Sequence, residues 1–165
     1  MNNLRRICVF SFVLMIVFSG FDAPAQEKKI RKKDVPQAVI SAFEKAYPGA
    51  LVRGYSSEIE GGKVKYEIES FRNKFTLDVL YLPDGSVAEV EEGLTVGELP
   101  DAVKAAVKAS YPRGRIAKAE KKTVGLDVTY ELRVSSGKIG IDLEIASGGR
   151  ILRDSQKEST KERED

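Results

Sequence analysis

Four acidic residues at repeated positions have the side chains and the spacing for binding chemistry. Glu67 and Asp78 lie in two consecutive segments that alternate like β-strands, and Glu131 and Asp142 follow 64 residues later. Carboxylates held side by side can bind Ca²⁺ or accept a lysine or arginine from a partner protein. A buried carboxylate with a raised pKa could instead act as a catalytic acid or base. The same acids could equally be solvated side chains on a polar face.

The position of the hairpin turn decides which acids face one another. A turn at residues 72–73 would bring Glu67 opposite a residue within one place of Asp78. Leu80 and Leu82 interrupt the polar pattern of that face, and apolar residues on an otherwise wet face are an interface signal. The residues that we expect to contact a partner protein are Glu67, Asp78, Leu80, Leu82, Glu131 and Asp142.

Several kinds of chemistry are absent from the chain. It has no histidine and no tryptophan, and its one cysteine, Cys8, lies in the N-terminal segment. This composition excludes Ser-His-Asp and Cys-His catalysis and metal sites built from thiolate or imidazole. No glycine-rich phosphate loop is present either. We therefore expect a protein that is not an enzyme, with no catalytic residues, no metal site and no cofactor. Two alternatives remain open: a Ca²⁺-responsive structural envelope protein, and a small hydrolase that uses a carboxylate.

The first 25 residues have the three parts of a secretory signal peptide. Arg5 and Arg6 precede an apolar run over residues 7–18, and residues 23–25, Ala-Pro-Ala, supply a small-residue cleavage pattern. The apolar run is shorter than a membrane span requires. We expect an exported protein, periplasmic or secreted, without a membrane span after cleavage. Residues 26–33 are strongly basic and are predicted to be a solvated leader.

The chain repeats its own pattern without a gap after 64 residues. Val35-Pro36 returns as Leu99-Pro100, and a Tyr-Pro pair and a Tyr-Glu pair return at the same offset. A repeat of this length that contains both kinds of periodicity indicates a duplicated α+β unit. We expect a first repeat at residues 34–92, a linker at 93–98, a second repeat at 99–154 and a disordered charged tail at 155–165.

Each repeat is predicted to contain one helix followed by four antiparallel strands. The first helix begins at Pro36 and ends before Pro48, and the strands cover residues 50–60, 63–71, 74–82 and 86–92. Because each strand has one clean apolar face, the helices should cover one face of the sheet and leave the other wet. Tyr47 and Tyr111 are then core residues. The two half-sheets should be joined into one or lie edge to edge.

The order of these motifs resembles the PepSY-like family of exported bacterial proteins, also described as β-lactamase-inhibitor-like. The residues that carry the resemblance are Val35-Pro36, Tyr47-Pro48, Tyr66-Glu67, Asp78 and Asp84-Gly85, and in the second repeat Leu99-Pro100, Tyr111-Pro112, Tyr130-Glu131, Asp142 and Gly148-Gly149. The resemblance implies a tandem fold whose sheet presents a concave protein-binding face, without catalysis. The partner is expected to be another envelope or secreted protein that this chain inhibits or escorts. A formal net charge of +2 does not favour nucleic acid as the partner.

Overall fold

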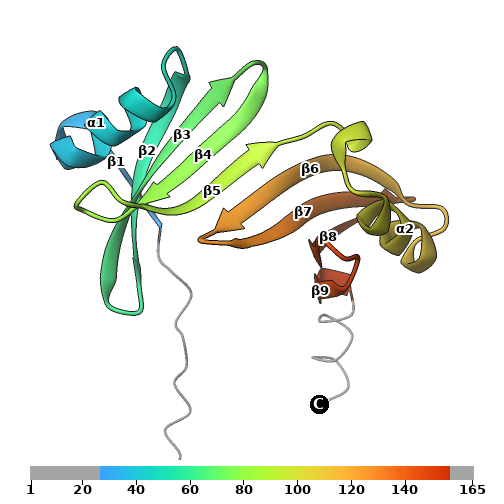
Figure 1. The fold of residues 1–165 in the computed structure, drawn as a ribbon. Helices are drawn as coiled ribbons and strands as arrows, with labels where there is room; N and C mark the ends of the chain where they lie inside the picture. The colour runs from blue at the N-terminus through green and yellow to red at the C-terminus, as the bar shows by residue number, and fades with distance from the viewer. Residues whose placement is uncertain (1–26, 157–165) are drawn as a thin grey trace, which may run out of the picture.

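The computed structural model describes residues 27–156, which form one antiparallel sheet with a helix against each half (Figure 1). The sheet has nine strands in the order of the chain, so every strand pairs with its neighbours in sequence. The predicted signal peptide lies outside the described residues. Of the predicted charged tail, only Ser155 and Gln156 are described, and both are helical. No helix within residues 27–156 is long and apolar enough to cross a membrane.

The elements follow the same order in both halves. The first half consists of β1 (Lys28–Ile30), a 3₁₀ turn (Lys32–Asp34), α1 (Gln37–Ala46), β2 (Leu51–Glu60), β3 (Lys63–Arg72), β4 (Phe75–Tyr81) and β5 (Val87–Gly93). The second half consists of a 3₁₀ turn (Val96–Glu98), α2 (Asp101–Ser110), β6 (Arg115–Val124), β7 (Asp127–Ser136), β8 (Ile139–Ala146) and β9 (Ile151–Asp154).

Each helix begins directly after a proline, which lacks the N–H that a helix start leaves unpaired. Pro36 precedes α1 and Pro100 precedes α2. The buried residues of α1 recur at helical spacing and are Val39, Ile40 and Phe43. They pack against Ile68, Leu77, Val79 and Tyr81, which point to the same side of β3 and β4. Each helix therefore covers one face of its half of the sheet and leaves the opposite face open.

The second half has a hydrophobic core of its own. Its buried residues are Leu99, Val103, Val107, Ala119, Tyr130, Leu132, Val134, Ile141, Leu143 and Ile145. Tyr47 and Tyr111 are partly buried and pack against the first and the second core, respectively. The hydroxyl of Tyr111 also donates a hydrogen bond to the carboxylate of Asp154 and lies 2.7 Å from both carboxylate oxygens. Two separate cores agree with a duplicated unit.

The strands do not divide into two separate four-stranded sheets. β5 pairs with β4 on one side and with β6 on the other, through Val90–Thr123, Glu91–Lys122, Glu92–Lys121 and Gly93–Glu120. We call this contact between the halves the junction. The two half-sheets, which the sequence left either joined or edge to edge, are therefore continuous.

The basic leader predicted at residues 26–33 contains an additional strand. β1 pairs Lys28 with Ser57 and Lys29 with Ser56, and the pairs Glu92–Lys121 and Gly93–Glu120 have the same register 64 residues later. β1 is thus the first-half equivalent of the end of β5. The side chains of both lysines are exposed, as expected for a solvated segment, but the backbone belongs to the sheet.

A glycine turn fixes each half of the sheet to its helix. Gly85 follows β4 with φ +87°, and Gly149 follows β8 with φ +86°. A Cβ at Gly85 would lie 2.7 Å from the carbonyl oxygen of Ala38, and a Cβ at Gly149 would lie 2.6 Å from that of Ala102. Only glycine combines the positive φ with such a close approach to a helix backbone. These contacts hold each helix against its half of the sheet.

Candidate functional site: the open face of the sheet

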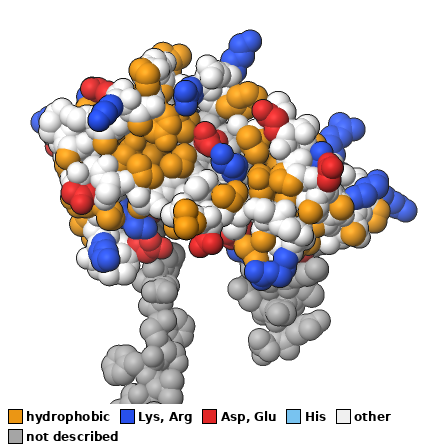
Figure 2. Space-filling model, in the orientation of Figure 1, with side chains coloured by type: hydrophobic (Ala, Val, Ile, Leu, Met, Phe, Trp, Pro, Cys, Tyr) orange, Lys and Arg blue, Asp and Glu red, His pale blue; other side chains and the backbone are white. Residues whose placement is uncertain are grey.

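The open face is the side of the sheet that neither helix covers. Alternation along β3 places Glu67 and Glu69 on this face, while Ile68 and Ser70 are buried on the other. In the view of Figure 2, hydrophobic side chains gather in patches with charged residues between them. The apolar patches seen in this view do not single out one site, and the hollows of the open face are more informative.

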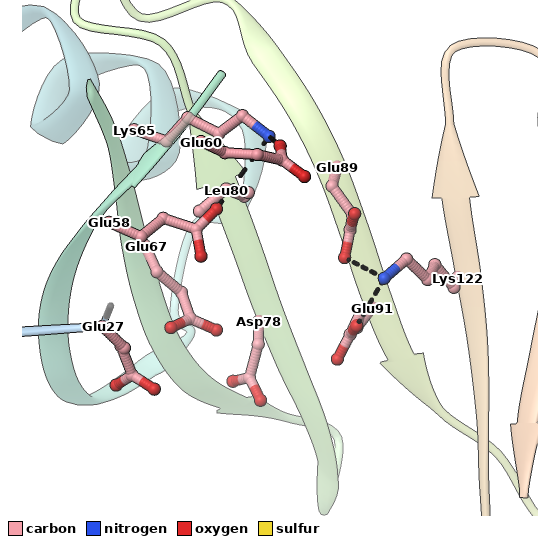
Figure 3. A pocket seen from close by; sticks show the side chains of 10 residues that line it. All are labelled: Glu27, Glu58, Glu60, Lys65, Glu67, Asp78, Leu80, Glu89, Glu91 and Lys122. Atoms are coloured by element: carbon pink, nitrogen blue, oxygen red, sulfur yellow. Dashed lines mark hydrogen bonds and ion pairs between the residues drawn. The ribbon is translucent and has the colours of Figure 1, made fainter. Parts of the chain in front are cut away.

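A groove on the open face spans the first half and the junction (Figure 3). Ten residues line it: Glu27, Glu58, Glu60, Lys65, Glu67, Asp78, Leu80, Glu89, Glu91 and Lys122. We call it the acidic groove, because seven of its lining residues are acids and two are lysines. They come from β2, β3, β4, β5 and β6 and from Glu27, which directly precedes β1. Leu80 is the one apolar lining residue.

The sequence-predicted residues separate into three places. Glu67, Asp78 and Leu80 line the acidic groove. Glu131 and Asp142 line a second hollow, in the second half, together with Lys118, Glu120, Leu132, Arg133, Leu143 and Arg153. Leu82 lines neither hollow: it follows β4 in the turn, where its backbone N–H donates a hydrogen bond to the carbonyl of Ser86.

The hairpin between β3 and β4 turns one residue later than predicted. Asn73 and Lys74 occupy the turn with φ +52° and +72°, and two successive positive φ values are typical of a tight two-residue hairpin turn. Glu67 is consequently opposite Leu80, and Asp78 is opposite Glu69. The expectation that Glu67 would face a residue within one place of Asp78 is therefore wrong. All these residues remain on the open face, because the register moves by an even number of positions.

Local hydrogen bonds hold the two predicted acids of the first half. The hydroxyl of Ser56 donates to Glu67 Oε2 at 2.8 Å, and the backbone N–H of Ser70 donates to Asp78 Oδ1 at 3.0 Å. Burial raises the pKa of Glu67, an effect that the Ser56 hydrogen bond opposes and the nearby acids reinforce. Burial also raises the pKa of Asp78, although its bond with Ser70 N–H and the nearby Arg53 oppose the shift. Both carboxylates therefore lie in a partly desolvated setting, which disfavours their charged forms.

The acids of the second half are paired with bases. Arg133 Nε lies 2.5 Å from Asp142 Oδ1, and Lys118 Nζ lies 2.7 Å from Glu120 Oε1. Glu131 Oε1 lies 3.5 Å from the ammonium of Lys122, which reaches it from β6. Asp78 likewise lies 3.4 Å from an arginine, Arg53. The two predicted pairs therefore differ at the glutamates, because Glu131 has a lysine beside it and Glu67 forms no ion pair among the described residues.

Charged side chains that were not predicted from the sequence meet at the junction. Lys122 Nζ lies 2.8 Å from Glu89 Oε1 and 3.5 Å from Glu91 Oε1. Burial, followed by the charge of Glu131, raises the pKa of Glu91 to about 7. The 64-residue repeat could have drawn attention to these residues, because it makes Lys122 equivalent to Glu58 and Glu91 equivalent to Glu27.

A further contact crosses the junction over a glycine. Thr76 on β4 donates a hydrogen bond of 3.0 Å to Glu120 Oε1 on β6. Gly93 on β5 lies beneath this contact, and a Cβ there would be 2.7 Å from Thr76 Oγ1. The absence of a side chain at Gly93 therefore allows β4 and β6 to interact across the strand between them.

Three acids at the edge of the groove come close enough to share a cation. One carboxylate oxygen from each of Glu27, Glu67 and Glu69 lies within 4.8 Å of the others. Such a group can hold an ammonium, a guanidinium or a divalent metal ion. We call these three residues the acid cradle.

The chain is similar to one protein family over two overlapping segments. The family described as "Putative beta-lactamase-inhibitor-like, PepSY-like" matches residues 23–88 and 70–153. The first segment begins ahead of the predicted first repeat and so includes β1. No curated protein is significantly similar to the chain.

Several solved structures have the same fold. A BLIP-like protein from Bacteroides fragilis is 23% identical with a TM-score of 0.56, over 73% of this chain and 84% of that one. A structure described as "putative periplasmic proteins" from Bacteroides eggerthii is 21% identical with a TM-score of 0.61, over 73% and 87%. A DUF2874 family protein from Bacteroides uniformis is 20% identical with a TM-score of 0.60, over 73% and 88%. At these identities the similarity concerns the fold.

Proposed function

The chain belongs to the PepSY-like family, and we propose that it is an exported, non-enzymatic module that binds another envelope or secreted protein on its open face. Binding there would inhibit or escort the partner. Export is supported by the tripartite segment at residues 1–25 and by a similar structure described as periplasmic. A protein-binding role is supported by a sheet face that no element of residues 27–156 covers.

The observation that carries the proposal is the setting of Leu80. It is a partly exposed apolar residue in a groove of charged side chains, paired with Glu67 on one side and Glu89 on the other. An apolar contact surrounded by polar groups is the usual arrangement at the centre of a protein–protein interface. The second repeat has Glu144 at the equivalent position, also on its open face, so the fold accepts an acid there.

The test is affinity capture from an envelope extract with the wild type and with Leu80→Glu. We expect the variant to lose its partner by about tenfold or more and to unfold at nearly the wild-type temperature. Leu126→Glu is the matched control, because Leu126 is fully exposed (100%) in the β6–β7 turn and does not line the groove. If Leu80→Glu unfolds the protein, Leu80 is a core residue and the site assignment is wrong. Equal capture by both variants would also contradict it.

A Ca²⁺-responsive role is a second candidate, favoured by the acid cradle. Ca²⁺ binds six to eight oxygen ligands at about 2.3–2.6 Å, and three carboxylates could supply part of that set. Under this candidate, Ca²⁺ would raise the melting temperature of the wild type in calorimetry and leave Glu67→Gln unchanged. A melting temperature that does not respond to Ca²⁺ in the wild type would remove this candidate.

A carboxylate hydrolase would require a buried acid with a strongly raised pKa, and Glu91 has a pKa raised to about 7. We assign Glu91 to the junction instead, because its carboxylate shares Lys122 with Glu89 and Glu131. Its raised pKa follows from burial and from the neighbouring acids. The acid therefore has a structural explanation that needs no substrate.

A further inference from the structure

The two repeats provide an internal comparison of one position on the open face. The strand pairs Lys28–Ser57 and Glu92–Lys121 are equivalent, so Glu27 and Glu58 in the first repeat correspond to Glu91 and Lys122 in the second. By the same offset, Glu67 corresponds to Glu131. Both repeats thus keep two glutamates, one on each side of a central strand. The residue on the strand between these glutamates is Glu58 in the first repeat and Lys122 in the second.

In the second repeat, an ammonium group occupies this position. Lys122 Nζ lies 3.5 Å from Glu91 Oε1 and 3.5 Å from Glu131 Oε1, and 2.8 Å from Glu89 Oε1. Mutual attraction with these acids raises the pKa of Lys122 against the opposing effect of burial. The geometry of the fold at this position therefore suits a lysine side chain surrounded by carboxylates.

In the first repeat, the equivalent acids have no such lysine. Within residues 27–156, neither Glu27 nor Glu67 forms an ion pair, and Glu58 stands where the lysine would be. Lys65 and Arg53 are both engaged with acids outside the acid cradle, and of its three members only Glu69 has one of them within ion-pair distance. Lys65 forms ion pairs with Glu58 and Glu60, and Arg53 lies 3.9 Å from Glu69 and 3.4 Å from Asp78. The acid cradle consequently carries an excess of negative charge.

The surroundings of the acid cradle suit a long basic side chain better than an isolated ion. Leu80 lies in the same groove, opposite Glu67 on the neighbouring strand. A lysine or arginine has an apolar stem that can cover such a residue while its charged end contacts carboxylates. The groove therefore offers an apolar surface for the stem of such a side chain and carboxylates for its charged end.

We propose that the acid cradle of the first repeat binds a lysine or arginine side chain of the partner protein, in the position that Lys122 occupies in the second repeat. This inference rests on the proposed function and adds the chemistry of the partner: a segment with a basic side chain that enters the acidic groove. In the second repeat, the position among the acids is occupied by Lys122 of the same chain. The equivalent position in the first repeat is therefore the one that a basic side chain of a partner can occupy.

The test uses a synthetic heptapeptide of alternating threonine and lysine, titrated into the purified protein by calorimetry and by NMR. We expect binding that shifts the backbone amides of Glu67 and Leu80 and weakens about tenfold or more when the lysines are acetylated. Glu58→Lys should weaken binding to a similar extent, because its own ammonium would fill the acid cradle. Glu44→Lys is the matched control: it changes the net charge equally on the exposed surface of α1 and should weaken binding about twofold at most.

Several results would overturn the inference. Equal binding of the acetylated peptide, or full binding by Glu58→Lys in a folded state, would mean that no ammonium enters the acid cradle. If Glu58→Lys does not fold, Glu67→Gln takes its place, and full binding by that variant is equally decisive. A Ca²⁺-dependent rise in melting temperature that Glu67→Gln abolishes would identify a metal site instead. If the peptide fails to bind while Leu80→Glu still abolishes partner capture, this inference is wrong and the proposed function stands.

Discussion

Replacing Tyr81 with phenylalanine should stabilise the protein, although tyrosine-to-phenylalanine changes in a core usually do the opposite. Tyr81 is 0% exposed and lies at the end of β4 beneath α1. Its hydroxyl has no hydrogen-bond partner among the described residues. The equivalent residue of the second repeat is Ile145, which is also 0% exposed and has no polar atom in its side chain. The position itself therefore does not require a hydroxyl.

The expected gain follows from the cost of an unpaired buried hydroxyl. Removing such a group from water without a new partner costs about 1–3 kcal/mol, and phenylalanine keeps the buried ring. The structure around the ring will relax only in part, so we expect Tyr81→Phe to raise the free energy of unfolding by about 1–2 kcal/mol. For a protein of this size that gain corresponds to a melting temperature about 3–6 °C higher.

Urea unfolding measures the effect, with Tyr111→Phe as the matched control. The hydroxyl of Tyr111 donates to the buried carboxylate of Asp154, so the same change there should lower the free energy of unfolding by about 1.5–3 kcal/mol. The two substitutions should have opposite signs at an unchanged denaturant slope. Destabilisation by Tyr81→Phe would refute the reasoning, since it would mean that the hydroxyl is partnered, for example by a buried water molecule.

Three further predictions concern the turns and the junction. Gly85→Ala should lower the free energy of unfolding by about 2–4 kcal/mol, because an alanine there would have a positive φ and its Cβ would clash with a carbonyl of α1. Gly49→Ala is the control: Gly49 also has a positive φ, but a Cβ there would have nothing within 4 Å, so the change should cost only about 1 kcal/mol. Gly93→Ala should cost about 1–2 kcal/mol by displacing Thr76 from its bond across the junction, and a double-mutant cycle with Thr76→Val should show that the two effects are not additive. Glu91→Gln should stabilise the protein by about 1–2 kcal/mol at pH 8 and leave it unchanged at pH 4 in urea titrations. The folded pKa of Glu91, about 7, lies above its ordinary value of 4.5, so the stability from its neutral form is present below about pH 4.5 and is lost as the pH rises through 7.

The repeated pattern predicted the elements of the fold well, because strand alternation and helical spacing record burial directly. Val39 and Phe43 face the core as their spacing predicted, and Pro83-Asp84-Gly85 forms the turn that its residues favour. The β3–β4 turn was misplaced by one residue, because residues 72–74 include no glycine or proline to fix its position. That single step moved the partner of Glu67 from the neighbourhood of Asp78 to Leu80.

Strand β1 was missed for a different reason. It is three residues long and includes two lysines, so neither alternation nor hydrophobicity distinguishes it from a solvated segment. Its place in the sheet depends on tertiary pairing with β2. Glu27 and Glu58 were missed with it, since their role depends on which strands are neighbours. Comparing Glu58 with Lys122 across the repeat was possible from the sequence, but the contacts that give the exchange its meaning belong to the folded chain.

The two outermost strands limit how this sheet can meet other copies of itself. A long strand at the margin of a sheet presents unpaired backbone groups on which a second molecule can extend the ladder. Here β1 has three residues and β9 has four, whereas the strands inside them, β2 and β8, have ten and eight. Lys28 and Lys29 add positive charge at the first margin, and at the other the backbone becomes helical at Ser155. We therefore expect the protein to resist edge-to-edge polymerisation at high concentration.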